Sequence, residues 1–461
     1  MERLAEEDLV NWYNRNRRKP LIIRGARQVG KSTLVRNFTD KNNIKLHEIN
    51  LEQNLHLADA FKSMNPDLII EEIQRTTSNK ISPTEILFID EIQAIPEAIA
   101  ALRYLYEEKP GMPILAAGSL LEVVLSKANF SMPVGRVEFM YLGPMLFSEF
   151  CLATDNDDLV EFCREYNLDQ MYSQAAHKRL LDLFRFYLTV GGMPEAVLAY
   201  SETFEVAEAQ RVHSSILETY RNDFGKYSTR PQSVRLNKVV DQLPTLIGKK
   251  LKFSNIDPNE QSRDLSEAVD LLCLAGFINK VYHSDSTAIP LKSGVNYKVY
   301  KPYVLDCGLS STMRGADSVG IKELSNSDFF SDGSLAEQFI SQHLFFKGGS
   351  TIKPENHYWL REGKQGNAEV GFVQQFGNEI VPIEVKAGTS GSLKSLLQFL
   401  AVLEAKIGVR FDINQPSQMK FDHKVSTKKG LQGISGKLLS LPSYLVEQLP
   451  RLYTQTQSVD H

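Results

Sequence analysis

The stretch Leu21-Ile-Ile-Arg-Gly-Ala-Arg-Gln-Val-Gly-Lys-Ser-Thr33 decides the fold of the N-terminal part of this chain. Its first three residues indicate a short buried strand, and the residues from Thr33 to Thr39 indicate the first turns of a helix. Between them, residues 25–32 fit the pattern G-x-x-x-x-G-K-S/T. A strand, this glycine-rich loop and a helix in that order form a phosphate-binding loop, because backbone N–H groups and the positive end of the helix dipole point at the bound anion.

This loop predicts a nucleoside triphosphate site with ATP and Mg²⁺ as its ligands. Gly25 and Gly30 allow the backbone to curl around the phosphates, and Lys31 can reach the β- and γ-phosphates. Ser32 offers its hydroxyl to Mg²⁺. We expect the nucleotide to lie against one continuous run of residues: Gly25, Ala26, Arg27, Gln28, Val29, Gly30, Lys31, Ser32 and Thr33.

Strands and helices alternate through residues 1–150. Residues 45–51, 85–90 and 113–117 have the apolar character of strands, and residues 97–108 carry apolar side chains at helical spacing. The run at 85–90 does not alternate, as expected of a strand that is covered on both faces. The pattern predicts an α/β fold of the P-loop NTPase type, in which helices cover both sides of a parallel sheet.

A pair of acids ends the apolar strand near residue 90, as in a Walker B segment. Asp90 and Glu91 follow Ile86-Leu-Phe-Ile89, and ligands of open α/β sheets bind just outside such strand ends. We therefore expect Asp90 to hold Mg²⁺ together with Ser32. Glu91 is expected to act as the general base that orients and deprotonates the attacking water.

Two further residues are candidates for the catalytic group. Ser119, at the end of the next strand, could sense the γ-phosphate or the water, and a helix N-cap is the alternative. Arg136 could stabilise transition-state charge as an arginine finger, and an ordinary surface arginine is the alternative. The predicted catalytic residues are therefore Lys31, Glu91, Ser119 and Arg136.

Composition limits the remaining possibilities. A chain of 461 residues is long enough for about three domains. Its net charge of −4 gives no domain-wide basic field, so any nucleic-acid surface must be local. Four cysteines without C-x-x-C spacing argue against a zinc cluster or a disulfide framework, and an acidic start without a long apolar run predicts a cytoplasmic protein that does not cross a membrane.

The rest of the chain falls into further segments. Glycines and a proline at Val190-Gly-Gly-Met-Pro194 interrupt a helical region, and a Ser-, Asp- and Gly-rich stretch from Gly315 to Ser334 indicates a linker. We predict, in order, a P-loop ATPase core at 1–150, a helical extension at 151–230, a winged-helix-like domain at 231–315, a nuclease-like α/β domain at 330–452 and a frayed tail at 453–461.

Several sequence blocks resemble one known family over nearly the whole chain. The N-terminal blocks are Arg24-Gly-Ala-Arg-Gln-Val-Gly-Lys-Ser32, Ile89-Asp-Glu-Ile-Gln93, Ala117-Gly-Ser-Leu-Leu121 and Gly135-Arg136. The later ones are Leu142-Gly-Pro-Met-Leu-Phe-Ser-Glu-Phe150, Gly191-Gly-Met-Pro-Glu-Ala196, Asp306-Cys-Gly-Leu309 and Gly391-Ser-Leu-Lys-Ser395. They are similar to prokaryotic AAA-type P-loop ATPases that have a C-terminal domain of unknown function of the DUF4143 type. The resemblance implies a P-loop core, a winged helix and a restriction-endonuclease-like C-terminal fold.

Four charged residues in the last segment resemble the metal site of such nucleases. Glu337 lies on an expected helix, Glu369 on a strand, and Glu384 and Lys386 form an E-x-K pair on one face of the next strand. In an active nuclease the acids hold Mg²⁺ and the lysine polarises the water. The pattern calls for aspartate at Gly371, and glycine offers no side-chain oxygen.

Three interpretations of this degenerate site stay open. An inactive nuclease-like fold is one, and metal-dependent cleavage with Glu369 as the substitute ligand is another. A solvated Glu384–Lys386 pair is the third, and Pro382 supports it because proline favours an edge strand or the opening residue of a strand.

The partners are less defined than the nucleotide. The basic runs Arg15–Lys19 and Lys420–Lys437 could contact DNA phosphates without sequence preference, whereas acids on the winged-helix segment, such as Glu267, oppose sequence-specific binding. The leading hypothesis is an Mg²⁺-dependent ATPase whose nucleotide state moves the C-terminal parts, with DNA as a candidate partner. The alternatives are a slow nucleotide-gated switch or scaffold that binds a protein partner, and an ATP-regulated metal-dependent nuclease. A homo-oligomer also stays open.

Overall fold

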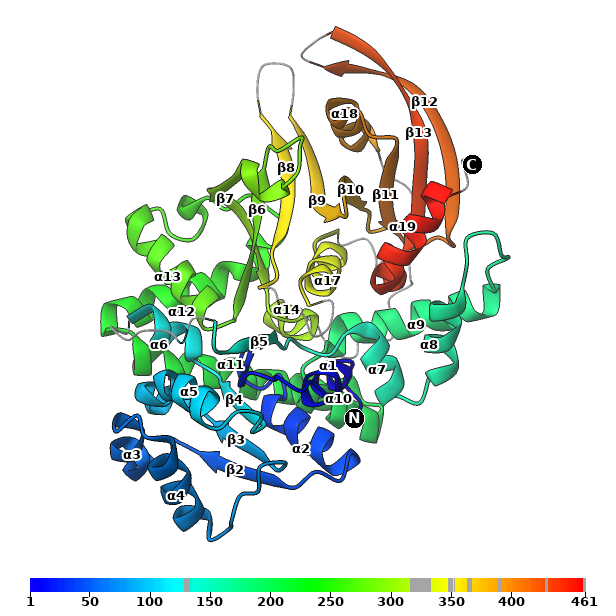
Figure 1. Ribbon diagram of the computed structural model, residues 1–461. Coiled ribbons are helices and arrows are strands. Elements are labelled where there is room, and N and C mark those ends of the chain that lie inside the picture. Colours follow the sequence, from blue (N-terminus) through cyan, green and yellow to red (C-terminus); the bar gives the residue numbers. More distant parts are fainter. Residues whose placement is uncertain are drawn as a thin grey trace. The chain divides into compact units, whose positions relative to one another are not determined.

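The computed structural model describes residues 1–127, 133, 135–315, 333–346, 351, 353–362, 367–388, 392–427 and 430–458. The expected linker at 315–334 lies almost wholly outside these residues. Two compact units make up the chain, one formed by Met1–Met145 with two short later segments and the other by the remainder (Figure 1). The first boundary, between Met145 and Leu146, falls close to the expected one at 150.

The first unit is built on a five-stranded parallel sheet with the order β2-β3-β4-β1-β5. Its strands are β1 (Leu21–Arg24), β2 (Leu46–Asn50), β3 (Ile86–Asp90), β4 (Ile114–Gly118) and β5 (Glu138–Tyr141). Its helices are α1 (Ala5–Tyr13), α2 (Lys31–Lys41), α3 (Ala58–Lys62), α4 (Pro66–Thr77), α5 (Pro96–Glu108) and α6 (Leu121–Lys127). This arrangement confirms the predicted α/β class.

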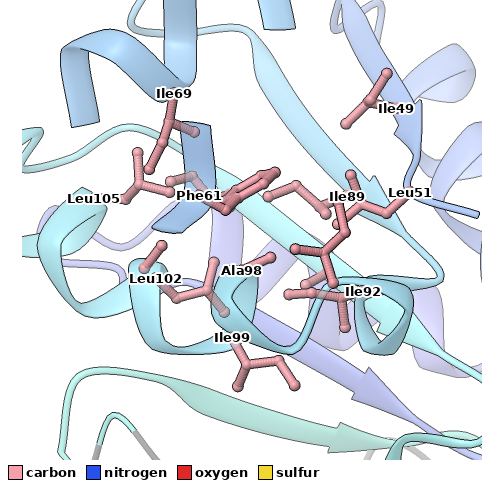
Figure 2. Packing of buried hydrophobic residues seen from close by; sticks show 14 of the residues in the cluster. Ile49, Leu51, Phe61, Ile69, Ile89, Ile92, Ala98, Ile99, Leu102 and Leu105 are labelled. Atoms are coloured by element: carbon pink, nitrogen blue, oxygen red, sulfur yellow. The ribbon is translucent and has the colours of Figure 1, made fainter. Parts of the chain in front are cut away.

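One hydrophobic core lies between this sheet and helices α3, α4 and α5. Ile89 points from the sheet toward Phe61 of α3 and Ile92, and α5 contributes Ala98, Ile99, Leu102 and Leu105 (Figure 2). Its neighbour in β3, Phe88, is also fully buried although it faces the opposite side of the strand. Burial on both faces explains why β3 is apolar throughout.

The second unit contains an eight-stranded mixed sheet with the order β12-β13-β11-β10-β9-β8-β6-β7. Its strands are β6 (Ile278–Ser284), β7 (Val295–Val304), β8 (Asn356–Arg361), β9 (Ala368–Phe376), β10 (Glu379–Val385), β11 (Ile407–Asp412), β12 (Ser417–Thr427) and β13 (Gly430–Pro442). On one face, Phe399 stacks on Trp359 of β8 at 4.6 Å between ring centroids and anchors a core with β9, β12 and β13.

Helices fill the rest of the chain. The helical segment contains α7 (Phe147–Ala153), α8 (Asp157–Glu165), α9 (Gln174–Val190), α10 (Pro194–Thr203) and α11 (Val206–Tyr227). The middle and C-terminal helices are α12 (Arg230–Leu246), α13 (Ser262–Leu274), α14 (Cys307–Met313), α17 (Gly333–Phe345), α18 (Lys394–Leu403) and α19 (Leu449–Ser458). Helix α17 joins the end of β7 through Gln338, whose side-chain amide bonds both the N–H and the C=O of Val304.

Two expectations about the C-terminal half were wrong. Strand β10 lies between β9 and β11, not at an edge, and Pro382 is tolerated because pairing with β11 begins only at Ile383. The residues expected to fray after 453 continue α19 to Ser458. Leu452, Tyr453 and Thr456 are buried at helical spacing. One face of this helix is therefore packed against the protein although its sequence is mostly polar.

The hairpin expected as the wing of a winged helix belongs to the large sheet. Strands β6 and β7 pair antiparallel, and β6 also pairs with β8 in parallel, with Val281 opposite Asn356. The hairpin of the predicted middle domain is therefore shared with the predicted nuclease-like domain. The winged-helix interpretation stays a prediction.

A fully buried carboxylate ties three segments of the second unit together. Asp306 caps α14 by accepting hydrogen bonds from the backbone N–H groups of Gly308 and Leu309, at 2.8 and 3.1 Å. Its other oxygen accepts from Gly192 N at 2.6 Å and from the Gln342 amide of α17 at 3.2 Å. Two of the sequence blocks noted above therefore meet at one side chain.

We predict that Asp306→Ala destabilises the second unit far more than the loss of an ordinary helix cap. The substitution leaves three buried N–H groups without their acceptor, which costs roughly 3 kcal/mol or more. Ser173→Ala removes an exposed cap of α9 and should cost about 1 kcal/mol. Urea unfolding followed by the fluorescence of Trp359, with Trp12 replaced by phenylalanine, measures both, and equal losses would contradict the central role of Asp306.

Candidate functional site

The residues predicted to act on a nucleotide gather at the carboxyl ends of three neighbouring strands. The phosphate-binding loop follows β1, Asp90 and Glu91 end β3, and Ser119 follows β4, which lies between β1 and β3. Arg24 at the end of β1 pairs with Gly118 at the end of β4. All strands run in one direction, so these ends share one edge of the sheet.

The loop is held in a tight curve by two glycines. An added Cβ on Gly25 would lie 2.2 Å from the carbonyl oxygen of Leu142, so no other residue fits there without moving backbone. Gly30 adopts φ +86° at the N-terminus of α2, a conformation that favours glycine. Arg3, which sequence reasoning missed, donates to Val29 O and to Gly143 O, both at 2.9 Å, and ties the loop to the segment after β5.

Lys31 is buried although its side chain ends in a charged ammonium group. Its ammonium donates to the carbonyl oxygens of Gly25 at 3.1 Å and Ala26 at 2.7 Å, inside the loop. Burial lowers the pKa of Lys31 to about 8, although the carboxylates of Glu91 and Asp90 act in the opposite direction. A phosphate next to this ammonium would place a negative charge in direct contact with it, where the loop offers only carbonyl oxygens.

Ser32 and Asp90 form the pair expected to hold a metal ion. The Ser32 hydroxyl donates to Asp90 Oδ2 at 2.7 Å, and the backbone N–H of Glu91 donates to Asp90 Oδ1 at 2.9 Å. Burial raises the pKa of Asp90, and the hydrogen bond from Ser32 acts against this shift. Both side chains offer hard oxygen ligands at one point, which fits Mg²⁺.

Glu91 is held by two side chains at once. Its Oε2 accepts from the Gln93 amide at 2.5 Å and from the Ser119 hydroxyl at 3.0 Å, with the Ser119 N–H at 3.4 Å. Gln93 itself is packed against Gly118, where an added Cβ would lie 2.2 Å from Gln93 Oε1. Gln93 belongs to one of the family blocks, but nothing in the local sequence shows that its side chain turns back to Glu91.

Arg136 does not join this group. It precedes β5, whose first residue Glu138 pairs with Leu21, the first residue of β1, so Arg136 lies toward the amino ends of the strands. Its Nε donates to Glu107 at the end of α5 at 2.7 Å. In this conformation the candidate finger thus lies toward the amino ends of the strands, whereas Lys31 follows the carboxyl end of β1, and the role of Arg136 stays a prediction.

The remaining loop residues differ in exposure. Ala26 and Val29 are buried, Arg27 is half-buried, and Gln28, at φ +62°, and Thr33 are exposed. The basic runs expected to meet DNA are partly engaged within the chain. Arg15 pairs with Glu138 at 2.9 Å and Lys437 is buried against Thr456 O at 3.3 Å.

The four residues of the predicted nuclease-like site lie close together, and a fifth residue that was not predicted lies among them. Glu337 and Glu369 both pair with a buried lysine of β7, Lys301, and Glu384 pairs with Lys386 at 2.5 Å. Within the described residues, no three His, Cys, Asp or Glu side chains are arranged to hold a metal ion. None of the described helices combines the length and apolar character that crossing a membrane requires.

Three family models match successive parts of the chain. Residues 17–151 match a model described as an AAA domain, and residues 332–424 match a domain of unknown function, DUF4143. A further domain of unknown function, DUF8612, matches residues 181–320 and crosses the boundary expected near 230. No curated protein matches the chain.

Several solved structures are similar over most of their length. The ORC2 protein of Aeropyrum pernix, solved as ADPNP-ADP complexes, shares 12% identity over 69% of this chain and 93% of its own, with a TM-score of 0.33. The RuvB Holliday junction branch migration motor of Thermotoga maritima shares 13% over 60% and 86%, with a TM-score of 0.27. AMPPCP-bound DnaA of Aquifex aeolicus shares 15% over 57% and 73%, with a TM-score of 0.24. At such low scores, the fold assignment rests on the strand order and the family models.

We predict that Lys31→Met removes a pH-dependent contribution to the stability of the first unit. The pKa of Lys31 is about 8 when folded and about 10.5 when unfolded, so below pH 8 both states hold the proton and the buried charge costs roughly 3 kcal/mol. Above pH 8 the folded state has lost the proton and the unfolded state keeps it, so stability relative to Lys31→Met rises by about 1.4 kcal/mol per pH unit up to about pH 10.

Urea unfolding at pH 7 and pH 9.5 measures this difference. Trp12 fluorescence reports the first unit once Trp359 is replaced by phenylalanine, since these are the two tryptophans of the chain. If the free energy of unfolding differs by the same amount between the Lys31 and Lys31→Met proteins at both pH values, burial does not lower the pKa of Lys31.

Proposed function

Because the chain combines an AAA domain with a C-terminal DUF4143 domain, we propose that it is an Mg²⁺-dependent ATPase whose nucleotide state is passed to the second unit. The observation that carries the proposal is the arrangement of two bonded pairs at one sheet edge. Ser32 bonds Asp90 at 2.7 Å, and Ser119 bonds Glu91 at 3.0 Å. The first pair offers oxygen ligands for a metal ion, and the second holds a carboxylate that can act as a general base. Both pairs lie next to the phosphate-binding loop.

In this proposal the loop binds the nucleotide and Lys31 neutralises its outer phosphates. The backbone N–H groups of residues 25–33 surround the phosphates, and Lys31 exchanges its loop carbonyls for phosphate oxygens. Ser32 and Asp90 would hold Mg²⁺, which supplies charge neutralisation on the phosphate oxygens when bound. Their geometry fits this role, since both oxygens already point to one place.

Glu91 would accept the proton of the attacking water. The water oxygen forms a bond to the γ-phosphorus, the bond from that phosphorus to the bridging oxygen of ADP breaks, and the proton passes to a Glu91 carboxylate oxygen. Oε1 of Glu91 is the oxygen that Gln93 and Ser119 do not bond, so it is the one we assign to the water. Gln93 and Ser119 fix the direction in which it points.

A slow nucleotide-gated switch is a second candidate, and it depends on how the contacts of Glu91 act. Three donors converge on one oxygen of Glu91, which holds the carboxylate firmly. If they keep Glu91 away from the water, the protein would bind ATP and turn it over rarely. The same contacts therefore support either an oriented base or a restrained one.

In this proposal a short stretch of chain carries the nucleotide state from one unit to the other. In the first unit, Leu142 N donates to Arg24 O at 2.8 Å, and Leu142 O lies against Gly25 of the loop. Six residues later, Ser148 lies at the start of α7 in the second unit. Any shift of the loop that displaces Leu142 pulls on this covalent connection.

The far end of that stretch is fixed by two side chains of the second unit. Phe147 N donates to Nε2 of His343 at 2.9 Å, and Ser148 N donates to Glu447 at 2.9 Å. Burial lowers the pKa of His343 to about 3, so the ring is neutral and Nε2 can accept, while Nδ1 bonds Phe339 O. Burial raises the pKa of Glu447 to about 7, although Ser148 bonds it.

We predict that purified protein hydrolyses ATP with Mg²⁺ and that Lys31→Ala and Glu91→Gln reduce turnover. Loss of the general base should lower kcat by about 10²-fold or more. Lys31→Ala should weaken nucleotide binding, whereas Glu91→Gln should preserve it. Phosphate release and nucleotide binding are measured separately for each variant, and turnover unchanged by either substitution would end the ATPase proposal.

The same assay separates the two candidate functions and addresses the partner. Gln93→Leu removes one donor from Glu91, so turnover falls if the contact orients the base and rises if the contact restrains it. Ser119→Ala is the matched variant on the other side of the carboxylate. Stimulation of turnover by single- or double-stranded DNA would favour DNA as the partner, and indifference would favour a protein.

We predict that nucleotide binding changes hydrogen exchange at the start of α7. Glu91→Gln protein, which binds without turnover, is compared with and without ATP and Mg²⁺. The amides of Phe147 and Ser148 should exchange at different rates in the two states, because their acceptors lie on other elements. Amides held by Asp306 at Gly308 and Leu309 serve as the control, and identical exchange in α7 would contradict transmission through this stretch.

A further inference from the structure

The second unit holds a buried ammonium ion that the ATPase proposal does not use. Lys301 lies on β7, at the edge of the large sheet, and its side chain is 0% exposed. Lysine is rarely buried to this extent unless its charge is paired. The groups around Lys301 therefore explain its place in the fold.

Carboxylates from two different elements surround this ammonium. Glu369 of β9 pairs directly with Lys301 Nζ, and Glu337 of α17 lies 3.6 Å from it. The Tyr303 hydroxyl donates to Glu337 Oε2 at 2.8 Å, and the ring of Tyr358 lies 5.1 Å from the ammonium. Two acids, a phenol and an aromatic face thus enclose one cation.

A third carboxylate belongs to the same charged group. Glu384 of β10 is 12% exposed and pairs with Lys386 at 2.5 Å. Burial raises the pKa of Glu384, and the charge of Glu337 acts in the same direction, whereas Lys386 and Lys301 act against them. The three acids are therefore close enough to influence one another and to need compensating positive charge.

Two ammonium groups, those of Lys301 and Lys386, offset two of the three carboxylate charges without any added ion. Burial by itself would lower the pKa of Lys301, but Glu337 and Glu369 outweigh it, so the pKa lies above its ordinary value and the ammonium stays charged at neutral pH. A divalent cation needs several free oxygens at about 2.0–2.6 Å from one point. Here one oxygen of each acid is already engaged: Glu337 Oε2 with Tyr303, Glu369 Oε1 with Lys301 and Glu384 Oε1 with Lys386. Among the described residues, these acids are also not arranged as a group that could hold a metal ion.

We propose that Lys301 is the built-in cation of this carboxylate site and takes the place that a divalent metal ion would need. The C-terminal domain then keeps its acids together without a metal and does not cleave nucleic acid. Glu369 does not act as the substitute ligand, because its Oε1 is paired with the ammonium of Lys301. Lack of room is not the reason for the missing acid, since an added Cβ on Gly371 would meet only Ile383 O, at 3.7 Å.

The proposal is tested by replacing the internal cation with an external one. The reference is the full-length Asp90→Asn protein, in which the candidate metal ligand of the first unit is removed. The test protein carries Lys301→Met in addition to Asp90→Asn. In EDTA, Lys301→Met should melt about 5 °C or more below the reference, because the acids lose their counter-charge. Millimolar Mn²⁺ should recover at least about half of that loss, and it should move the reference by less than about 1 °C.

Lys298→Met is the matched control. Lys298 lies on the same strand but is exposed, so its loss should change neither the melting temperature nor the response to Mn²⁺. A folded Lys301→Met protein that is as stable as the reference, or that gains nothing from Mn²⁺, would overturn the proposal.

A second measurement does not depend on the folding of the Lys301 variant. Mn²⁺ binding to the reference protein is followed by electron paramagnetic resonance, before and after Glu369→Gln or Glu384→Gln. Equal binding in all three proteins supports an internally occupied site. Bound Mn²⁺ that disappears with either substitution, or Mn²⁺-dependent cleavage of DNA that Glu384→Gln abolishes, would show that a metal enters the site and that Lys301 does not replace it.

Discussion

A parallel sheet brings the carboxyl ends of all its strands to one edge, and the candidate site of this protein depends on that constraint. Four strand ends contribute: the loop after β1, Asp90 and Glu91 at β3, Ser119 after β4, and Leu142 after β5. The same constraint places Arg136 away from this site, because Arg136 precedes β5 and so lies toward the amino ends of the strands. It also explains how a contact between Gly25 and Leu142 can link the phosphate-binding loop to the segment that leaves the first unit.

The parts of this site that the sequence predicted are those with local signals. A glycine-rich loop between a strand and a helix, and an apolar strand that ends in two acids, each carry their meaning within about ten residues. Ser119 was predicted from its place after a strand, and its bond to Glu91 agrees with a sensor position, while its role stays a proposal. Strand β5 was not predicted, since its four residues alternate weakly and are only partly buried.

The parts that could not be predicted depend on contacts between distant residues. Gln93 turns back to Glu91 because Gly118, on another strand, leaves it room. Lys301 meets Glu337 and Glu369 only after β7, α17 and β9 have assembled, and an isolated lysine in a strand predicts no such partners. The tail after 453 misled for a related reason, because Thr456 looks like a solvated residue until the helix that buries it is known.

Two of the buried lysines, Lys31 and Lys301, differ in the groups that surround their charge. Lys31 faces carbonyl oxygens, which do not neutralise its charge, and its pKa falls to about 8. An anion that binds there gains the attraction of an ammonium whose charge Glu91 and Asp90 offset only in part. Lys301 faces carboxylates and its pKa rises, so its charge is already balanced and neither an anion nor a metal ion gains by entering. A buried lysine thus favours the binding of phosphate in the first unit, whereas in the second unit a buried lysine takes the place of a metal ion.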